Sequence, residues 1–297
     1  MHTYYLIFAC SYLLSTWGTY LNKKYQLTAG TGRSATAVYM IVNGIASALL
    51  PAFMFFFTDE SLEMTPYSLV FAFATVMCAA IATVGTLKAY EKGQIAIVTT
   101  FTTVGSIVMS CAWGILFLKE RITVEQAIAI ILMLISVLIV TVRKEVKIDK
   151  SVLWLLVLAA VTSSFTSVLS KQHQVEKTYA TVNTLSYSLW VGIIRSVVFG
   201  LFLLYDTKKN GGEMQKLSGM SFGYAIGASA ISGLCYIINL ITAVVLPITI
   251  TSPLGTALSI FLSAIMARVA YHEKMTKTQM AGMVLCVIGI FIFAWSK

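Results

Sequence analysis

The chain has 297 residues, of which 58% are hydrophobic and only 11% are charged, and its formal net charge is +9. Together with a mean hydropathy of +0.84, this composition leaves too little polar surface for a water-soluble domain, so the expected solvent is lipid. The basic residues are scattered through the connections without a dense run. This pattern argues against a nucleic-acid partner and favours contact with anionic lipid headgroups.

Continuous apolar runs, rather than alternating ones, predict helices, and a helix needs roughly 20 apolar residues to cross a bilayer. We predict ten membrane-spanning helices, over residues 3–21, 34–57, 67–89, 95–118, 124–142, 151–170, 180–205, 219–243, 248–270 and 277–295. Little sequence remains for a soluble domain, so we expect an all-α fold with a single membrane domain over residues 1–297. The five cysteines lie inside the predicted spans without a close pair, which is typical of packing residues rather than of disulfides or metal ligands.

One sequence pattern occurs twice, 153 residues apart: Glu-Arg-Ile-Thr followed by Gln over residues 120–126, and Glu-Lys-Met-Thr followed by Gln over residues 273–279. Each copy joins two apolar runs, and its Thr is expected to cap the helix that follows. The first spans of the two halves also align, at an offset of 148 residues. We therefore expect repeat one over 1–150 and repeat two over 151–297. With five spans each, an odd number, the repeats cross the membrane in opposite senses, as in many secondary transporters.

The first-span segment Trp17-Gly18-Thr19-Tyr20-Leu21-Asn22-Lys23 and the two Glu-basic-x-Thr-x-x-Gln junctions carry a resemblance to a known family. They resemble the drug/metabolite transporter superfamily, in its ten-helix EamA-like branch, over nearly the whole chain. The resemblance implies that both termini lie in the cytoplasm. The positive-inside rule implies the opposite, because most Lys and Arg residues fall in the loops on the other side. The sequence leaves the orientation open.

Arg195 lies near the middle of the seventh predicted span, where no acidic residue is expected at a comparable depth. A cation there costs about 2.5–3.5 kcal/mol on insertion scales, so it should face the bundle interior or water. It either holds an anionic group of a substrate or hydrogen-bonds helix carbonyls and snorkels along a tilted helix. Lys88, at the end of the third span, has the same two alternatives.

Hydroxyl residues recur at helical spacing on the fourth span and at matching positions on the ninth, which places each row on one helical face. Such rows either let membrane helices pack closely or line a cavity. Polar residues on the first, third and eighth spans could join them. The candidate substrate-binding residues are Arg195, Lys88, Trp17, Thr83, Thr99, Thr103, Ser106, Tyr236, Asn239, Thr256 and Ser259.

The sequence contains no phosphate-binding loop, nucleotide fingerprint or zinc-protease motif. Its one G-x-S-x-G string, over residues 219–223, opens an apolar run instead of a strand-to-helix turn. We therefore expect no catalytic residue, no cofactor and no bound metal. The expected function is a secondary transporter, exporting small anionic, zwitterionic or neutral metabolites such as amino acids by alternating access at a central cavity between the two repeats.

Two alternatives stay open at this stage: a polytopic membrane enzyme of lipid or acyl metabolism, and a non-transporting membrane receptor or scaffold. The expected partners are a small-molecule substrate and membrane lipids, with the chain acting as a monomer or a homodimer. The expected location is the bacterial cytoplasmic (inner) membrane, crossed several times.

Overall fold

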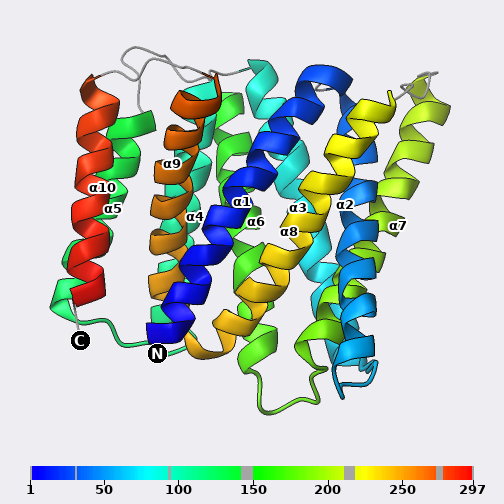
Figure 1. Ribbon diagram of the computed structural model, residues 1–297, viewed down its shortest axis with the longest axis horizontal. Helices are drawn as coiled ribbons and strands as arrows, with labels where there is room; N and C mark the ends of the chain where they lie inside the picture. Colours follow the sequence, from blue (N-terminus) through cyan, green and yellow to red (C-terminus); the bar gives the residue numbers. More distant parts are fainter. Residues whose placement is uncertain are drawn as a thin grey trace. The chain divides into compact units, whose positions relative to one another are not determined.

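The computed structural model describes residues 2–30, 32–92, 95–141, 150–210, 218–271 and 277–295. Within these ranges every predicted apolar run corresponds to one α-helix, and no strand is present (Figure 1). The helices are α1 (His2–Ala29), α2 (Arg33–Met54), α3 (Pro66–Lys92), α4 (Ile95–Leu116), α5 (Val124–Thr141), α6 (Lys150–Val175), α7 (Thr184–Asn210), α8 (Gly219–Val245), α9 (Ile248–Tyr271) and α10 (Lys277–Trp295), with a short 3-10 helix over Phe55–Phe57 after α2. The predicted all-α fold is confirmed.

Five helices within the described residues are long and apolar enough to cross a membrane, judged by length and composition. They cover Arg33–Phe57, Pro66–Thr83, Trp154–Val175, Thr184–Lys209 and Gly219–Val245. Shorter apolar helical stretches cover Gly105–Leu116, Val124–Ser136 and Met280–Ile292. The count of ten membrane-spanning helices stays a prediction.

The described chain divides into two compact units, and each unit takes segments from both halves of the sequence. The first unit comprises residues 77–172 and 245–297, and so contains α4, α5, α9 and α10. The second unit comprises residues 2–76 and 173–244, and contains α1, α2, α7 and α8. Helix α3 and helix α6 are each divided, with one segment in the first unit and the other in the second.

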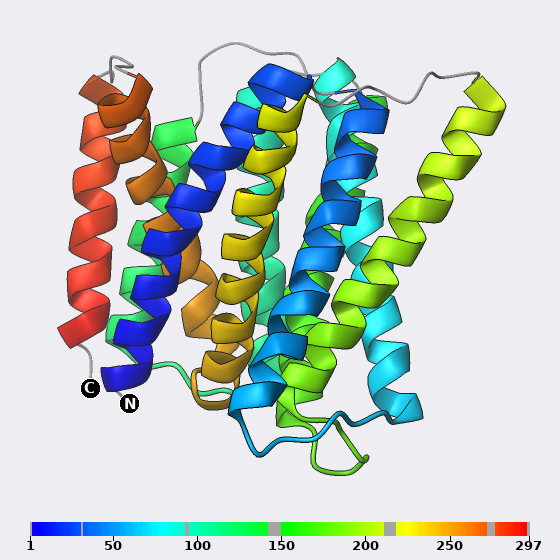
Figure 2. The same cartoon turned by 45° about the vertical axis from the view of Figure 1, so that its right-hand side comes forward.

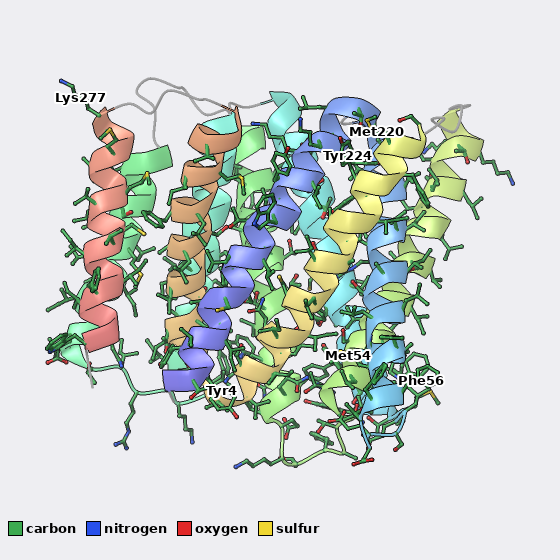
Figure 3. All side chains as sticks on the ribbon, viewed as in Figure 1. Tyr4, Met54, Phe56, Met220, Tyr224 and Lys277 are labelled. Atoms are coloured by element: carbon green, nitrogen blue, oxygen red, sulfur yellow. The ribbon has the colours of Figure 1, made fainter. Side chains whose placement is uncertain are left out.

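Helix α1 extends well past the predicted span end at residue 21, because its polar end is packed. Tyr25 and Ala29 are buried against Ala35 of α2 and Ala225 of α8, and the Tyr25 hydroxyl donates to the Ala35 carbonyl at 2.7 Å. Tyr224, labelled near the start of α8 in Figure 3, packs against the same cluster. Tertiary contacts, rather than hydropathy, determine where this helix ends.

Helix α7 begins four residues later than predicted, at Thr184, because Asn183 acts as its N-cap. The Asn183 side-chain oxygen accepts the Ser186 N–H at 2.8 Å, and the Glu63 carboxylate accepts the Asn183 N–H at 2.9 Å. The Trp190 indole N–H also donates to the Glu63 carbonyl, at 3.0 Å. The acidic segment after α2 is therefore fixed to the start of α7.

In the first unit, α5 and α10 lie side by side in both views (Figures 1 and 2). The Ser136 hydroxyl donates to the Gly282 carbonyl at 2.8 Å. A Cβ added at Gly289 would lie 3.3 Å from the Ala129 carbonyl oxygen. Ser136 and Gly289, like Ala129 and Gly282, are 153 residues apart in the sequence. Positions separated by 153 residues thus contact each other in both directions between the two helices.

The junction at Glu120 connects α4 to α5 and caps a third helix. The chain turns at Lys119, which has a φ of 53°. The Glu120 carboxylate then accepts the N–H groups of Ile248 and Thr249 at 2.8 and 2.9 Å, and the Thr249 hydroxyl at 2.9 Å. A carboxylate is favoured at this position, because the first N–H groups of α9 have no partner within their own helix.

The cap predicted for the helix after the first junction is confirmed. The Thr123 hydroxyl accepts the Gln126 N–H at 3.3 Å, and the Gln126 side chain accepts the Thr123 N–H at 3.0 Å, which is a capping box at the start of α5. Thr276 of the second copy lies outside the described residues.

In the second unit, α2 and α7 approach closely and diverge towards the C-terminal end of α7 (Figure 2). A Cβ added at Gly192 would lie 2.6 Å from the Ala48 nitrogen and 2.7 Å from the Gly44 carbonyl oxygen. One added at Gly44 would lie 2.8 Å from the Gly192 carbonyl oxygen and from the Ser196 nitrogen. Gly44 and Gly192, like Ala48 and Ser196, are 148 residues apart. This contact is also reciprocal, and only glycine allows it.

Replacing Gly192 by Ala should separate α2 from α7, because the new methyl group meets backbone atoms that cannot move independently. We expect Gly192→Ala to lower the free energy of unfolding by about 1–3 kcal/mol. Thermal unfolding of the purified protein in detergent measures the change. Gly200→Ala on the same helix is the matched control, since a Cβ there has no atom within 4 Å. Equal melting temperatures for the two variants would contradict the close contact.

Replacing Glu120 by Gln should destabilise the start of α9, because the neutral amide has only one oxygen for donors that the carboxylate now binds with two. We expect a loss of about 1.5–3 kcal/mol, the range for hydrogen bonds to charged groups. Thermal unfolding is again the measurement. Exposed Glu125 in the first turn of α5 provides the control, and Glu125→Gln should change the melting temperature much less than Glu120→Gln does. A Glu120→Gln protein as stable as this control would show that the cap is unimportant.

Candidate functional site

The candidate site is built where α2 and α7 meet in the second unit. Arg195 of α7 lies three residues after Gly192, and Asn43 of α2 immediately precedes Gly44. The close backbone contact at the two glycines brings these side chains together, and the Arg195 guanidinium donates from Nη1 to the Asn43 side-chain oxygen. Asn43 is only 6% exposed, whereas Arg195 is half-buried.

Two phenols complete the surroundings of the cation. Tyr39 of α2 and Tyr236 of α8 both lie close enough to Arg195 for an electrostatic interaction. The Tyr39 hydroxyl is hydrogen-bonded to the side chain of Ser232 on α8. We call these five residues, Arg195, Asn43, Tyr39, Tyr236 and Ser232, the Arg195 site. It contains one positive charge and four neutral polar groups.

Among the residues that the structure describes, no acidic side chain pairs with Arg195. A guanidinium carries five N–H donors, and only one bond, to Asn43, is formed. None of its other nitrogens is both buried and unpartnered, and the residue as a whole is partly exposed. An accessible guanidinium can bind a planar carboxylate through two parallel hydrogen bonds, which is the chemistry this site offers.

Of the candidates from the sequence, the structure brings Arg195 and Tyr236 together. Asn239 lies one helical turn further along α8, where its side-chain oxygen accepts a long hydrogen bond of 3.5 Å from the Ser11 hydroxyl of α1. Trp17 of α1 is 56% exposed, and its ring contacts Tyr20 edge-on, with centroids 6.0 Å apart. These two residues belong to the second unit without a contact to Arg195 among the described interactions.

The remaining candidates lie in the first unit. The Thr83 hydroxyl donates to the Ala79 carbonyl of its own helix at 2.8 Å, and the Ser106 carbonyl accepts the Ser164 hydroxyl of α6 at 3.1 Å. The first bond lies within α3 and the second joins the backbone of α4 to α6, so neither one decides between packing and cavity lining for the hydroxyl rows. Thr256 is half-buried and Ser259 is exposed. The side chains of Lys88, Thr99 and Thr103 lie outside the described residues.

Sequence reasoning missed Asn43, Tyr39 and Ser232. One signal was present, because Asn43 is an amide inside the apolar run of the second predicted span. Comparison of the repeats could not reveal it, since the position 148 residues later is Val191. Within the described ranges, no group of three or more His, Cys, Asp or Glu side chains is placed to hold a metal ion.

Comparison with known proteins gives a family match for the second half of the chain and a fold for nearly all of it. Residues 150–295 match the EamA-like transporter family. No curated protein matches the chain. A solved structure described only as "Crystal structure of protein" is similar, with a TM-score of 0.77 and 12% identity over 99% of this chain and 96% of that chain. The two share a fold. The family match and the apolar helices together indicate an integral, multi-pass membrane protein.

Removing only one partner of the Arg195–Asn43 hydrogen bond should destabilise the protein, because the Asn43 amide is buried. We expect Arg195→Met to cost about 1–3 kcal/mol of unfolding free energy, and the double variant Asn43→Leu/Arg195→Met to recover most of it, since both polar groups are then replaced. A double-mutant cycle of thermal unfolding measures the coupling. Additive effects of the two substitutions would argue against the hydrogen bond.

Proposed function

We propose that the chain is a secondary transporter of the drug/metabolite transporter superfamily, on the basis of the match of residues 150–295 to the EamA-like transporter family. Its proposed substrates are small anionic, zwitterionic or neutral metabolites, such as amino acids, and its proposed direction is export. Arg195 is the proposed binding residue for an anionic group of the substrate.

The observation that carries this proposal is a cation inside an apolar helix with a neutral partner. Among the described residues, the Arg195 guanidinium binds the Asn43 amide and no carboxylate. Placing an unneutralised cation at membrane depth costs several kcal/mol. An uncharged side chain could fill the same space between the helices without this free-energy cost. The presence of arginine is therefore best explained by a ligand that supplies the missing negative charge.

The proposed mechanism is alternating access between two inverted repeats. When a two-fold axis relates two helices, a contact between position i of the first helix and position j of the second is accompanied by a contact between position j of the first and position i of the second. The Gly44–Gly192 contact and the contacts of Ser136 with Gly282 and of Gly289 with Ala129 have this reciprocal form at the repeat offsets. They support repeats over 1–150 and 151–297, with the substrate bound near the membrane midplane as in other inverted-repeat transporters.

Reconstitution tests the proposal directly. Proteoliposomes containing the purified chain are incubated with a water-soluble metabolite extract from cells, and the solutes inside are identified by mass spectrometry. We expect the wild-type chain to accumulate a subset of metabolites with an anionic group, and Arg195→Met to accumulate them roughly tenfold less, since a charge-assisted pair is lost.

Lys209→Met serves as the matched control, because it removes an equal charge from an exposed position near the end of the same helix. It should transport like the wild type. Internal solutes identical to those of protein-free liposomes would overturn the transporter proposal. Full transport by Arg195→Met would leave the transporter proposal standing and remove Arg195 from the binding site.

A further inference from the structure

We infer that the Arg195 site selects solutes with a single carboxylate group over their amide and amine counterparts, because the Asn43 amide binds the guanidinium without neutralising it. The inference rests on the proposed transport function and goes beyond it. It assigns a specificity role to a residue of α2, whose neutral amide leaves the charge of Arg195 available to a ligand.

The partner of Arg195 is an amide where a carboxylate of the same shape would fit. Asp and Asn differ by one atom, and an Asp at position 43 would form a charge-assisted pair with the guanidinium. In the structure, Nη1 of Arg195 instead donates to the neutral side-chain oxygen of Asn43. The cation is therefore oriented by a hydrogen bond but not neutralised. A solute carboxylate can therefore gain the full electrostatic interaction without displacing an acidic side chain.

The repeat relation shows that this polar pair is not required for packing. At the offset of 148 residues, Arg195 corresponds to Ser47 and Asn43 corresponds to Val191. Ser47 and Val191 are both buried beside the same two glycines. The corresponding positions thus have a small hydroxyl and an aliphatic residue in one pair, and an arginine and an amide in the other. Helix packing alone does not explain the second pair.

The other groups of the site add hydrogen-bonding capacity without charge. Tyr39 and Tyr236 are phenols beside the guanidinium, and Ser232 binds the Tyr39 hydroxyl. The site therefore has a charge of +1, which one carboxylate cancels. A second carboxylate or a phosphate dianion would leave an unbalanced negative charge in surroundings that solvate it poorly, and an amide or an amine would leave the positive charge unbalanced.

The test exchanges the amide for a carboxylate. Proteoliposomes receive an equimolar mixture of the proteinogenic amino acids, their α-keto acids, their carboxamides and their decarboxylated amines, and uptake is read by mass spectrometry. The wild type should take up the acids that have one carboxylate and exclude the dicarboxylic acids and the matching amides and amines. Asn43→Asp should take up the same acids roughly tenfold less or worse, because its own carboxylate neutralises Arg195.

Two further variants separate charge from shape. Asn43→Ala should keep the preference for acids over amides, since the guanidinium stays unneutralised, and it provides the test of the same idea if Asn43→Asp does not fold. Asn22→Asp makes the same amide-to-carboxylate exchange on α1, at a residue that is not among the described partners of Arg195, and should match the wild type. A melting temperature of Asn43→Asp at or above that of the wild type would show that the new ion pair forms.

The outcomes distinguish the inference from the function on which it rests. No uptake by the wild type from this mixture or from a cell extract would overturn both. Wild-type uptake of amides as readily as acids, or of extract solutes that lack a carboxylate, would overturn the inference and leave transport standing. Undiminished acid uptake by a folded Asn43→Asp protein, or loss of the acid preference in Asn43→Ala, would do the same.

Discussion

The close approach of α2 and α7 at Gly44 and Gly192 determines where Arg195 lies. Without side chains at these two positions, backbone atoms of the two helices come into direct contact. Asn43 and Arg195 flank that contact, so the hydrogen bond between them follows from the helix crossing rather than from a flexible loop. A binding group mounted on two packed helices has a better-defined position than one mounted on a loop.

Both units contain a reciprocal contact between two helices, but the charged groups near these contacts have different partners. In the first unit, the contacts of Ser136 and Gly289 join α5 to α10, and the Glu120 carboxylate is consumed in capping α9. In the second unit, the reciprocal glycine contact is accompanied by a cation that has no described acidic partner. The Glu120 carboxylate accepts from three protein donors, whereas among the described residues the Arg195 guanidinium has one hydrogen-bond partner. That difference is why we propose the Arg195 site as the place for a ligand.

The sequence predicted the helices well, because each apolar run is long enough to require one. It did not predict where α1 ends or α7 begins, since these limits depend on the burial of Tyr25 and on the cap at Asn183, which are tertiary contacts. Arg195 was found because a cation inside an apolar run is conspicuous. Asn43 was not, because an amide in a span has many uses and the partner across the helix pair cannot be read from one chain. The spacing of the hydroxyl residues places each row on one face of its helix. It does not indicate whether that face packs against another helix or binds a ligand.

The central claim is that the accessible part of the Arg195 guanidinium binds the carboxylate of a transported solute. An experimental structure of the chain in lipid, determined with a carried carboxylate solute at saturating concentration, tests it most directly. We predict density for the carboxylate in two-point contact with Arg195, beside Tyr39 and Tyr236. A solute bound elsewhere, with Arg195 contacting only Asn43, would contradict the account.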